Sequence, residues 1–121
     1  MSVQQDFLAD CPARLAFDLL GHTWDPVVLW ALRHRPYRPR ELRRMIGGIS
    51  PKALTDTLNR LRHAGLLDRT AYPGVPPHVE YALTDLGRSL LGPVEALGIW
   101  AAEHGGEVAR AWEESERRAP G

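Results

Sequence analysis

The segment GISPKALTDTLNRLRHAGLL, residues 48–67, constrains the fold of this chain more than any other. Its apolar residues are leucines spaced four and then three apart, which places them on one face of an α-helix: Leu54, Leu58 and Leu61. Ser50 followed by Pro51 is a typical helix start, and Gly65 is typical of the residue just past a helix end. The pattern predicts a helix over 51–64 that packs on a core through its leucines.

The opposite face of this helix is polar. At 100° per residue it collects Lys52, Thr55, Asp56, Asn59 and His63. Asn pairs with adenine, Lys favours guanine, and Thr contacts a thymine methyl group or donates to a base. Asp56 fits a cytosine, or an ion pair with Lys52 or Arg60 at helical spacing. An ordinary amphipathic surface helix shows the same periodicity, so the surroundings of the helix decide between these interpretations.

The charge distribution favours a DNA-binding helix. The formal net charge is zero, but residues 33–63 carry nine basic against two acidic residues, a formal charge of +7. Such a local excess of positive charge indicates an anion-binding surface, which the zero net charge of the whole chain conceals. The candidate DNA contacts, base readers and phosphate contacts together, are Arg38, Arg40, Arg43, Arg44, Ser50, Lys52, Thr55, Asn59, Arg60, His63 and His78.

Prolines and glycines divide the rest of the chain into short elements. They predict helices over 12–20, 25–33 and 40–45, strands over 67–72 and 79–83 with a proline-rich tip at 73–78, and a long helix from Thr84 through Trp100. Asp25 is the expected N-cap of the second helix, and a further helix over 107–117 is expected in the charged tail, residues 105–121. The predicted fold class is mainly α with a small β-hairpin. The order of the predicted helices and strands is that of a winged helix-turn-helix.

The first and the long C-terminal helix are expected to join two copies of the chain. The apolar stripe of the C-terminal helix is too broad for an element that faces solvent. The expected interface residues are Leu15, Leu19, Leu90, Leu91, Val94, Leu97 and Trp100. A two-fold axis would place the two reading helices about 34–36 Å apart on a palindromic DNA site.

Several motifs resemble the HxlR-type winged-helix regulators of bacteria and archaea. They are CPARLAFDLLG at 11–21, Trp24, RELR at 40–43, GGISPKALTDTLNRLRHAGLLDR at 47–69, YPGVPPHVEYALTDLGRSL at 72–90 and LGIWAAEH at 97–104. The resemblance covers residues 7–104 and implies a homodimeric transcription factor that binds inverted-repeat operators. Two positions depart from the family pattern. Asp25 replaces a basic residue that is common in the family, and Pro39 stands where the family usually has an aromatic residue.

Cys11 is the candidate redox sensor. A thiol beside a helix start is favoured as thiolate, although the neighbouring Asp10 opposes this. Some members of the resembled family sense oxidants or electrophiles at the matching place. The alternative role is a small buried hydrophobe at the helix start. With no second cysteine, only an intersubunit disulfide, a mixed disulfide or an adduct is available.

No catalytic or metal-ligand pattern appears, so we expect neither an enzyme nor a cofactor. A ligand pocket between Trp24, Trp30 and Trp100 is a further candidate. The single cysteine, the lack of a secretory signal pattern and the lack of a run of about 20 apolar residues predict a cytoplasmic protein without membrane contact. The alternative function is a winged-helix module that binds protein instead of DNA. Lys52 and Asn59 favour DNA.

Overall fold

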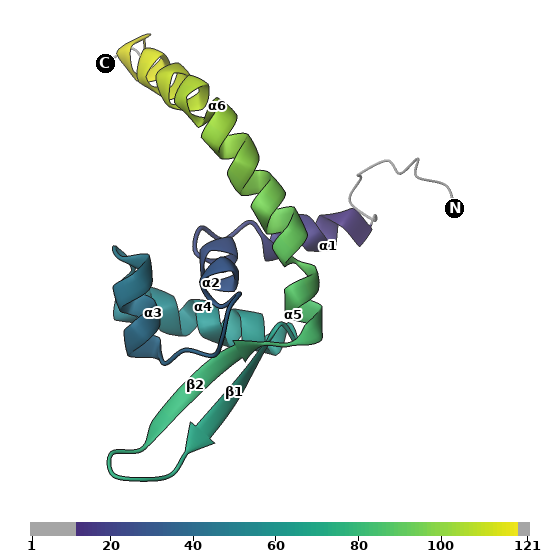
Figure 1. The fold of residues 1–121 in the computed structure, drawn as a ribbon. Helices are drawn as coiled ribbons and strands as arrows, with labels where there is room; N and C mark the ends of the chain where they lie inside the picture. Colours follow the sequence, from purple (N-terminus) through teal and green to yellow (C-terminus); the bar gives the residue numbers. More distant parts are fainter. Residues whose placement is uncertain (1–11, 119–121) are drawn as a thin grey trace.

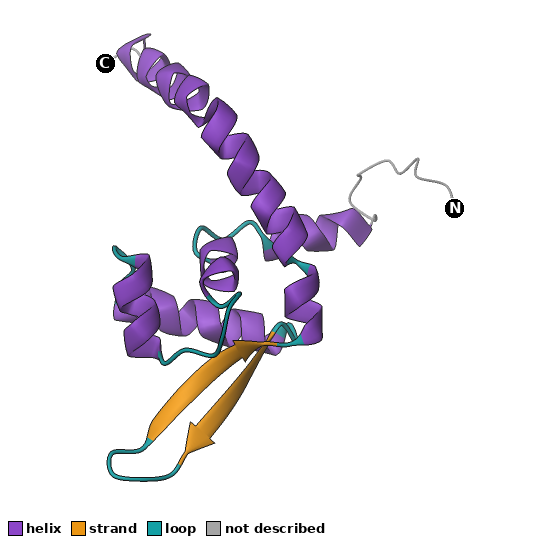
Figure 2. Ribbon diagram, viewed as in Figure 1, coloured by secondary structure: helices purple, strands orange, loops and turns teal. Residues whose placement is uncertain are grey.

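The computed structural model describes residues 12–118, and its elements form a winged helix-turn-helix. Their order is α1 (Pro12–Leu19), α2 (Asp25–Ala31), α3 (Pro39–Ile46), α4 (Pro51–His63), β1 (Leu67–Tyr72), β2 (His78–Leu83), α5 (Asp85–Ser89) and α6 (Leu91–Arg118). Helices α2, α3 and α4 lie together, the β1–β2 hairpin projects from them as the wing, and α6 extends away in the opposite direction (Figure 1, Figure 2). The mainly helical fold with one hairpin confirms the fold class expected from the sequence.

One apolar core joins the three helices to the base of the hairpin. The leucine face of α4 lies in it as predicted, and α2 is the most deeply buried helix, with Val28 and Leu29 inaccessible to solvent. The other elements contribute Leu42, Leu66, Leu67, Tyr81 and Leu83. The helix-turn-helix and the wing are therefore one packed unit.

The wing is an antiparallel pair whose register runs from Leu67 opposite Leu83 to Tyr72 opposite His78. Tyr37, in the segment between α2 and α3, exchanges two backbone hydrogen bonds with Tyr81 of β2, at 3.0 and 2.9 Å. This bridge ties the base of the wing to the helices. Beyond Leu67 the residues of β1 are exposed, so the contact of the wing with the core is made by β2, through the buried Tyr81 and Leu83.

The start of α2 differs from the sequence expectation. Trp24, not Asp25, occupies the N-cap position, and Asp25 is the first helical residue. The Asp25 carboxylate lies 2.7 Å from the Arg60 guanidinium of α4 and is only 2% exposed. The predicted cap is wrong because a partner 35 residues later in the chain takes the carboxylate.

The C-terminal helix is also divided differently from the expectation. Thr84 does cap a helix, since its Oγ1 accepts a hydrogen bond from the Gly87 N–H at 3.0 Å, but this helix, α5, ends at Ser89. Pro93 explains the break. It has no N–H to donate, and its ring would clash with the carbonyl of Ser89 in a continuous helix.

Helix α6 then runs without interruption through Gly105 and Gly106 to Arg118. Residues 107–117 are thus helical as expected, but they continue α6 instead of forming a helix of their own. At 1.5 Å per residue its 28 residues span about 42 Å, and only the first part contacts the rest of the chain (Figure 1).

Candidate nucleic-acid interface

Helix α4 has two faces, as its sequence predicts. Thr57 joins the leucines on the buried side. The exposed side consists of Lys52, Thr55, Asn59, Arg62 and His63. A helix held by one apolar face and open on the other is the geometry with which helix-turn-helix proteins enter the major groove.

The first turn of α4 is capped and carries an ion pair. Ser50 Oγ accepts a hydrogen bond from the Ala53 N–H at 3.0 Å, which confirms the predicted N-cap. Lys52 Nζ lies 2.8 Å from Asp56 Oδ2, one of the two partners considered for Asp56. Exposed pairs of this kind contribute about 0–1 kcal/mol. Lys52 can therefore leave Asp56 for a base or a phosphate at little cost.

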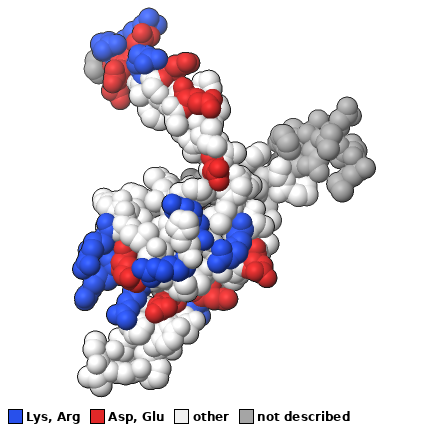
Figure 3. All heavy atoms as spheres, in the orientation of Figure 1, with Lys and Arg blue, Asp and Glu red and all other residues white. Residues whose placement is uncertain are grey.

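Helix α3 presents three arginines beside α4. It packs on the core through Leu42, which is fully buried, and its arginines are exposed. Arg40, Arg43 and Arg44 line one shallow depression together with Gly48 and Ile49 of the turn. Lys and Arg side chains gather over α3, whereas the visible face of the wing is nearly free of charge and the far end of α6 mixes both signs (Figure 3).

Glu41 holds the start of α3 in place. Its carboxylate accepts a hydrogen bond from the Arg38 N–H at 2.9 Å and lies 3.4 Å from the Arg35 guanidinium. The Arg38 N–H first, and the Arg35 guanidinium second, lower the pKa of the Glu41 carboxyl. The charge of Glu41 thus stabilises the N-terminus of α3 and keeps the arginine cluster oriented.

His78 lies at the first position of β2 and is held by its neighbours. Its ring stacks on Tyr72 with the centroids 4.8 Å apart, and its Nε2 lies 3.2 Å from Glu80 Oε2. A polar hollow between α3 and the wing is lined by Arg35, Arg38, Arg40, Glu41, His78 and Glu80. The structure therefore brings His78 next to the arginines that precede and begin α3.

Arg60 has partners inside the protein. Its Nη2 lies 2.7 Å from Asp25 Oδ1 and 3.1 Å from Thr57 Oγ1. Its Nε is buried and has no hydrogen-bond partner among residues 12–118. The candidate role of Arg60 as a DNA contact stays a prediction, and the geometry gives its guanidinium another task.

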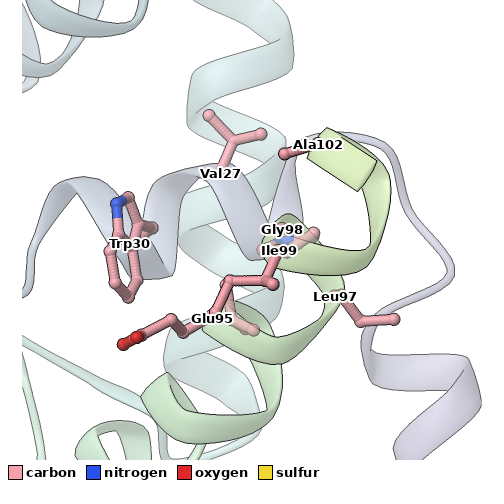
Figure 4. Close-up of a pocket in the computed structure, with 9 residues that line it drawn as sticks. Val27, Trp30, Glu95, Leu97, Gly98, Ile99 and Ala102 are labelled. Carbon is pink, nitrogen blue, oxygen red and sulfur yellow. The ribbon is translucent and has the colours of Figure 1, made fainter. Parts of the chain in front are cut away.

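An apolar groove of about 560 Å³ lies between α2 and the first half of α6. Val27 and Trp30 project into it from α2, and Leu97, Gly98, Ile99 and Ala102 come from α6 (Figure 4). Val27, Leu97 and Ile99 are all exposed in a single chain. The groove is therefore apolar surface that a single chain leaves open to solvent.

The residues expected at a dimer interface fall into three groups. Val94 lies in the core of its own chain. Leu19, Leu90 and Leu91 are half-buried against that core. More than half of the side-chain surface is exposed at Leu15, Leu97 and Trp100. The last group, on α1 and α6, is the part of the expected interface that a single chain leaves exposed.

The family model of the HxlR-like helix-turn-helix proteins matches residues 19–109, which is more than half of the chain. The chain belongs to the HxlR-like helix-turn-helix family. The matched region contains α2 to α5, the wing and the first part of α6, and thus the exposed face of α4, the arginines of α3 and the apolar groove. The resemblance inferred from the sequence motifs is confirmed.

The relatives of this HxlR-like protein are transcriptional regulators. The uncharacterized HTH-type transcriptional regulator YtfH of Escherichia coli is 45% identical over 94 residues, which cover 78% of this chain and 75% of YtfH. The structure of YtfH from Salmonella typhimurium superposes with a TM-score of 0.74 at 39% identity, and the match covers 88% of this chain and 96% of that one. The redox regulator HypR in its oxidized form gives a TM-score of 0.72 at 32% identity over 77% of this chain and 96% of HypR.

Cys11 lies outside the described residues, so the candidate sensor of this HxlR-like chain stays a prediction. Within residues 12–118, none of the helices combines the length and apolar character needed to cross a membrane. In the same part of the chain, no three His, Cys, Asp or Glu side chains are grouped so that they could hold a metal ion.

Two features of this HxlR-like chain were not expected from its sequence: the Asp25–Arg60 pair and the groove on α2. One signal was present for the pair: Asp25 is acidic where the resembled family commonly has a basic residue. The groove had no local signal, because it forms only when α6 crosses α2.

Proposed function

We propose that this chain is a homodimeric transcription factor that reads an inverted-repeat operator with helix α4. The observation that carries the proposal is the exposed face of α4 with Lys52, Thr55 and Asn59, next to the arginines of α3. These three residues follow one another at spacings of three and four, which lines them along one side of the helix. The similarity to HTH-type transcriptional regulators such as YtfH supports DNA as the partner.

The three residues offer different base contacts. Asn59 can bond adenine through two hydrogen bonds, Lys52 can donate to guanine, and Thr55 can touch a thymine methyl group. His63 extends the same side of α4 by one turn. The reading face is therefore about three helical turns long.

The phosphate contacts surround this reading face. We assign them to Arg38, Arg40, Arg43, Arg44, Ser50 and His78. Ser50 uses its oxygen to cap α4, so its hydroxyl hydrogen remains to donate to a phosphate. A winged helix that binds only protein has no need of this basic rim, which favours DNA over that alternative.

A second copy of the chain is the partner that we propose for α1 and α6. The groove beside α2 is lined by Leu97 of α6, and Leu15 of α1 and Trp100 of α6 add further exposed apolar surface. Gly98 supports this role, because no atom lies within 4 Å of where its Cβ would be. The groove floor is thus open to a side chain from outside. Two-fold pairing here would present both α4 helices to one palindrome.

An oxidant or electrophile is the effector class that we propose. Any thiol response of this chain must use Cys11, its single cysteine. The structural similarity to the redox regulator HypR supports this class. The alternative ligand site between Trp24, Trp30 and Trp100 has Trp30 at the groove and Trp100 exposed on α6.

Asn59→Ala is expected to weaken binding to the operator by about ten- to a hundredfold, because a paired base contact contributes about 1–3 kcal/mol of discrimination. Binding to random DNA of the same length should be nearly unchanged, since Asn59 is not assigned to a phosphate. The operator is first found by footprinting genomic DNA, and both affinities are then measured by fluorescence anisotropy. An equal loss on both duplexes would make Asn59 part of the scaffold.

Arg43→Ala is expected to weaken binding to both duplexes and to make the slope of log affinity against log salt shallower by about one unit. The physical reason is the release of one fewer counterion. Arg110→Ala removes the same charge from the distant half of α6 and should leave the slope unchanged (Figure 1). An unchanged slope in Arg43→Ala would place the DNA elsewhere on the protein.

A further inference from the structure

Asp25 and Arg60 join α2 to α4 by an ion pair that is buried at Asp25, whereas the Arg60 side chain is 37% exposed. Arg60 Nη2 and Asp25 Oδ1 are 2.7 Å apart, a charge-assisted hydrogen bond, and Asp25 is 2% exposed. The same nitrogen lies 3.1 Å from Oγ1 of the buried Thr57. The core between α2 and α4 is otherwise built from apolar side chains.

Stability alone does not account for such a pair. Burying the Asp25 carboxylate carries a desolvation cost that offsets much of its attraction to the partly exposed Arg60 guanidinium, and apolar replacements of buried ion pairs are often neutral or stabilising. The buried Arg60 Nε, without a partner among the described residues, adds to the cost. What the pair does provide is a fixed rotation of α4 relative to α2. Packed leucines tolerate some rotation of a helix, whereas a hydrogen bond is lost within a few tenths of an ångström and outside a limited angle.

The rotation of α4 determines where its base-reading side chains Lys52, Thr55 and Asn59 lie. Arg60 follows Asn59 in the chain, so any turn of α4 about its axis moves both. Base-reading groups lie about 6 Å from the helix axis, where a rotation of about 10° shifts them by roughly 1 Å. A shift of that size is enough to break a hydrogen bond to a base.

We propose that Arg60 is a positioning residue. Through Asp25 it fixes the rotation of α4 on α2, and so sets how Lys52, Thr55 and Asn59 meet the bases, without contacting DNA itself. This role rests on the proposed function.

The decisive variant is the apolar double substitution Asp25→Leu with Arg60→Met, in the full-length protein. It removes both charges together and leaves neither buried alone, so the melting temperature should stay close to that of the wild type. The ratio of operator to random-DNA affinity should fall about tenfold, with an unchanged salt slope. Asp25→Asn keeps Oδ1 as a hydrogen-bond acceptor, so its ratio of operator to random-DNA affinity should stay close to that of the wild type. Arg88→Met, which removes an arginine bonded to the Arg33 carbonyl, is the matched control and should match the wild type.

Two results would overturn the proposal. An apolar double variant that keeps the wild-type ratio would show that the pair only contributes to packing. An equal loss on both duplexes with a salt slope shallower by about one unit would make Arg60 a phosphate contact. If the double variant does not fold, the single variants Asp25→Asn and Arg60→Met are compared instead. A fall in the ratio of operator to random-DNA affinity as large in Asp25→Asn as in Arg60→Met would contradict positioning through Oδ1. If the wild type binds operator and random DNA equally well, the proposed function is refuted and this role with it. If the wild type discriminates between the two duplexes and the variants discriminate equally well, only this role is refuted.

Discussion

Gly87→Ala is expected to lower the free energy of unfolding by about 3 kcal/mol or more. A Cβ at this position would overlap the backbone carbonyl oxygen of Leu66 and press on Leu83. The Leu66 carbonyl cannot simply move away, because it accepts a hydrogen bond from the Thr84 N–H at 3.1 Å. The added methyl group therefore forces α5 off the end of the wing.

Gly92→Ala is the matched control for this substitution. Gly92 also lies in a helix, but nothing is within 4 Å of where its Cβ would be. Alanine there should be neutral or stabilising by up to about 1 kcal/mol, since it favours the helix. Urea denaturation followed by circular dichroism measures both changes. A Gly87→Ala variant as stable as Gly92→Ala would mean that α5 does not sit against Leu66 as described.

The local patterns of the sequence predicted the reading helix well. The leucine spacing gave its buried face, Ser50 its start, and Gly65 its end with a φ of 79°. All three signals lie within one helix and its flanking residues, so no distant contact competes with them. The exposure of the α3 arginines followed in the same way, because a short helix with one buried leucine must turn its charges outward.

The errors arose where distant residues compete with a local preference. Asp25 has the side chain of a good N-cap, but the Arg60 guanidinium offers its carboxylate a stronger, charge-assisted partner. The apolar spacing from Leu86 to Trp100 runs on across the break between α5 and α6, so periodicity alone hides the effect of Pro93. The close approach of Gly87 to Leu66 depends on how the wing returns to the helices, which no pattern within α5 reveals.

The largest effect on operator binding is expected from Leu97→Glu, which lies on α6 rather than on the reading helix. Leu97 is 52% exposed in one chain, so the subunit should still fold. In the proposed dimer the new carboxylate would be buried in the apolar groove beside Glu95, where none of the lining residues within 12–118 is a Lys or Arg. Two separate subunits lose the linkage between two half-site contacts, which lowers affinity for the full operator by about a hundredfold or more.

Leu86→Glu is the matched control for the dimer, because Leu86 is 58% exposed but lies on α5 and does not line the groove. Sedimentation at micromolar concentration should show a dimer for the wild type and for Leu86→Glu, and a monomer for Leu97→Glu. Affinity for the full operator should fall with the dimer, while the weak affinity for an isolated half-site should be kept, since α4 is untouched. A wild-type monomer that binds one half-site as tightly as the palindrome would contradict the proposed assembly, and so would a Leu97→Glu variant that remains a dimer with full operator affinity.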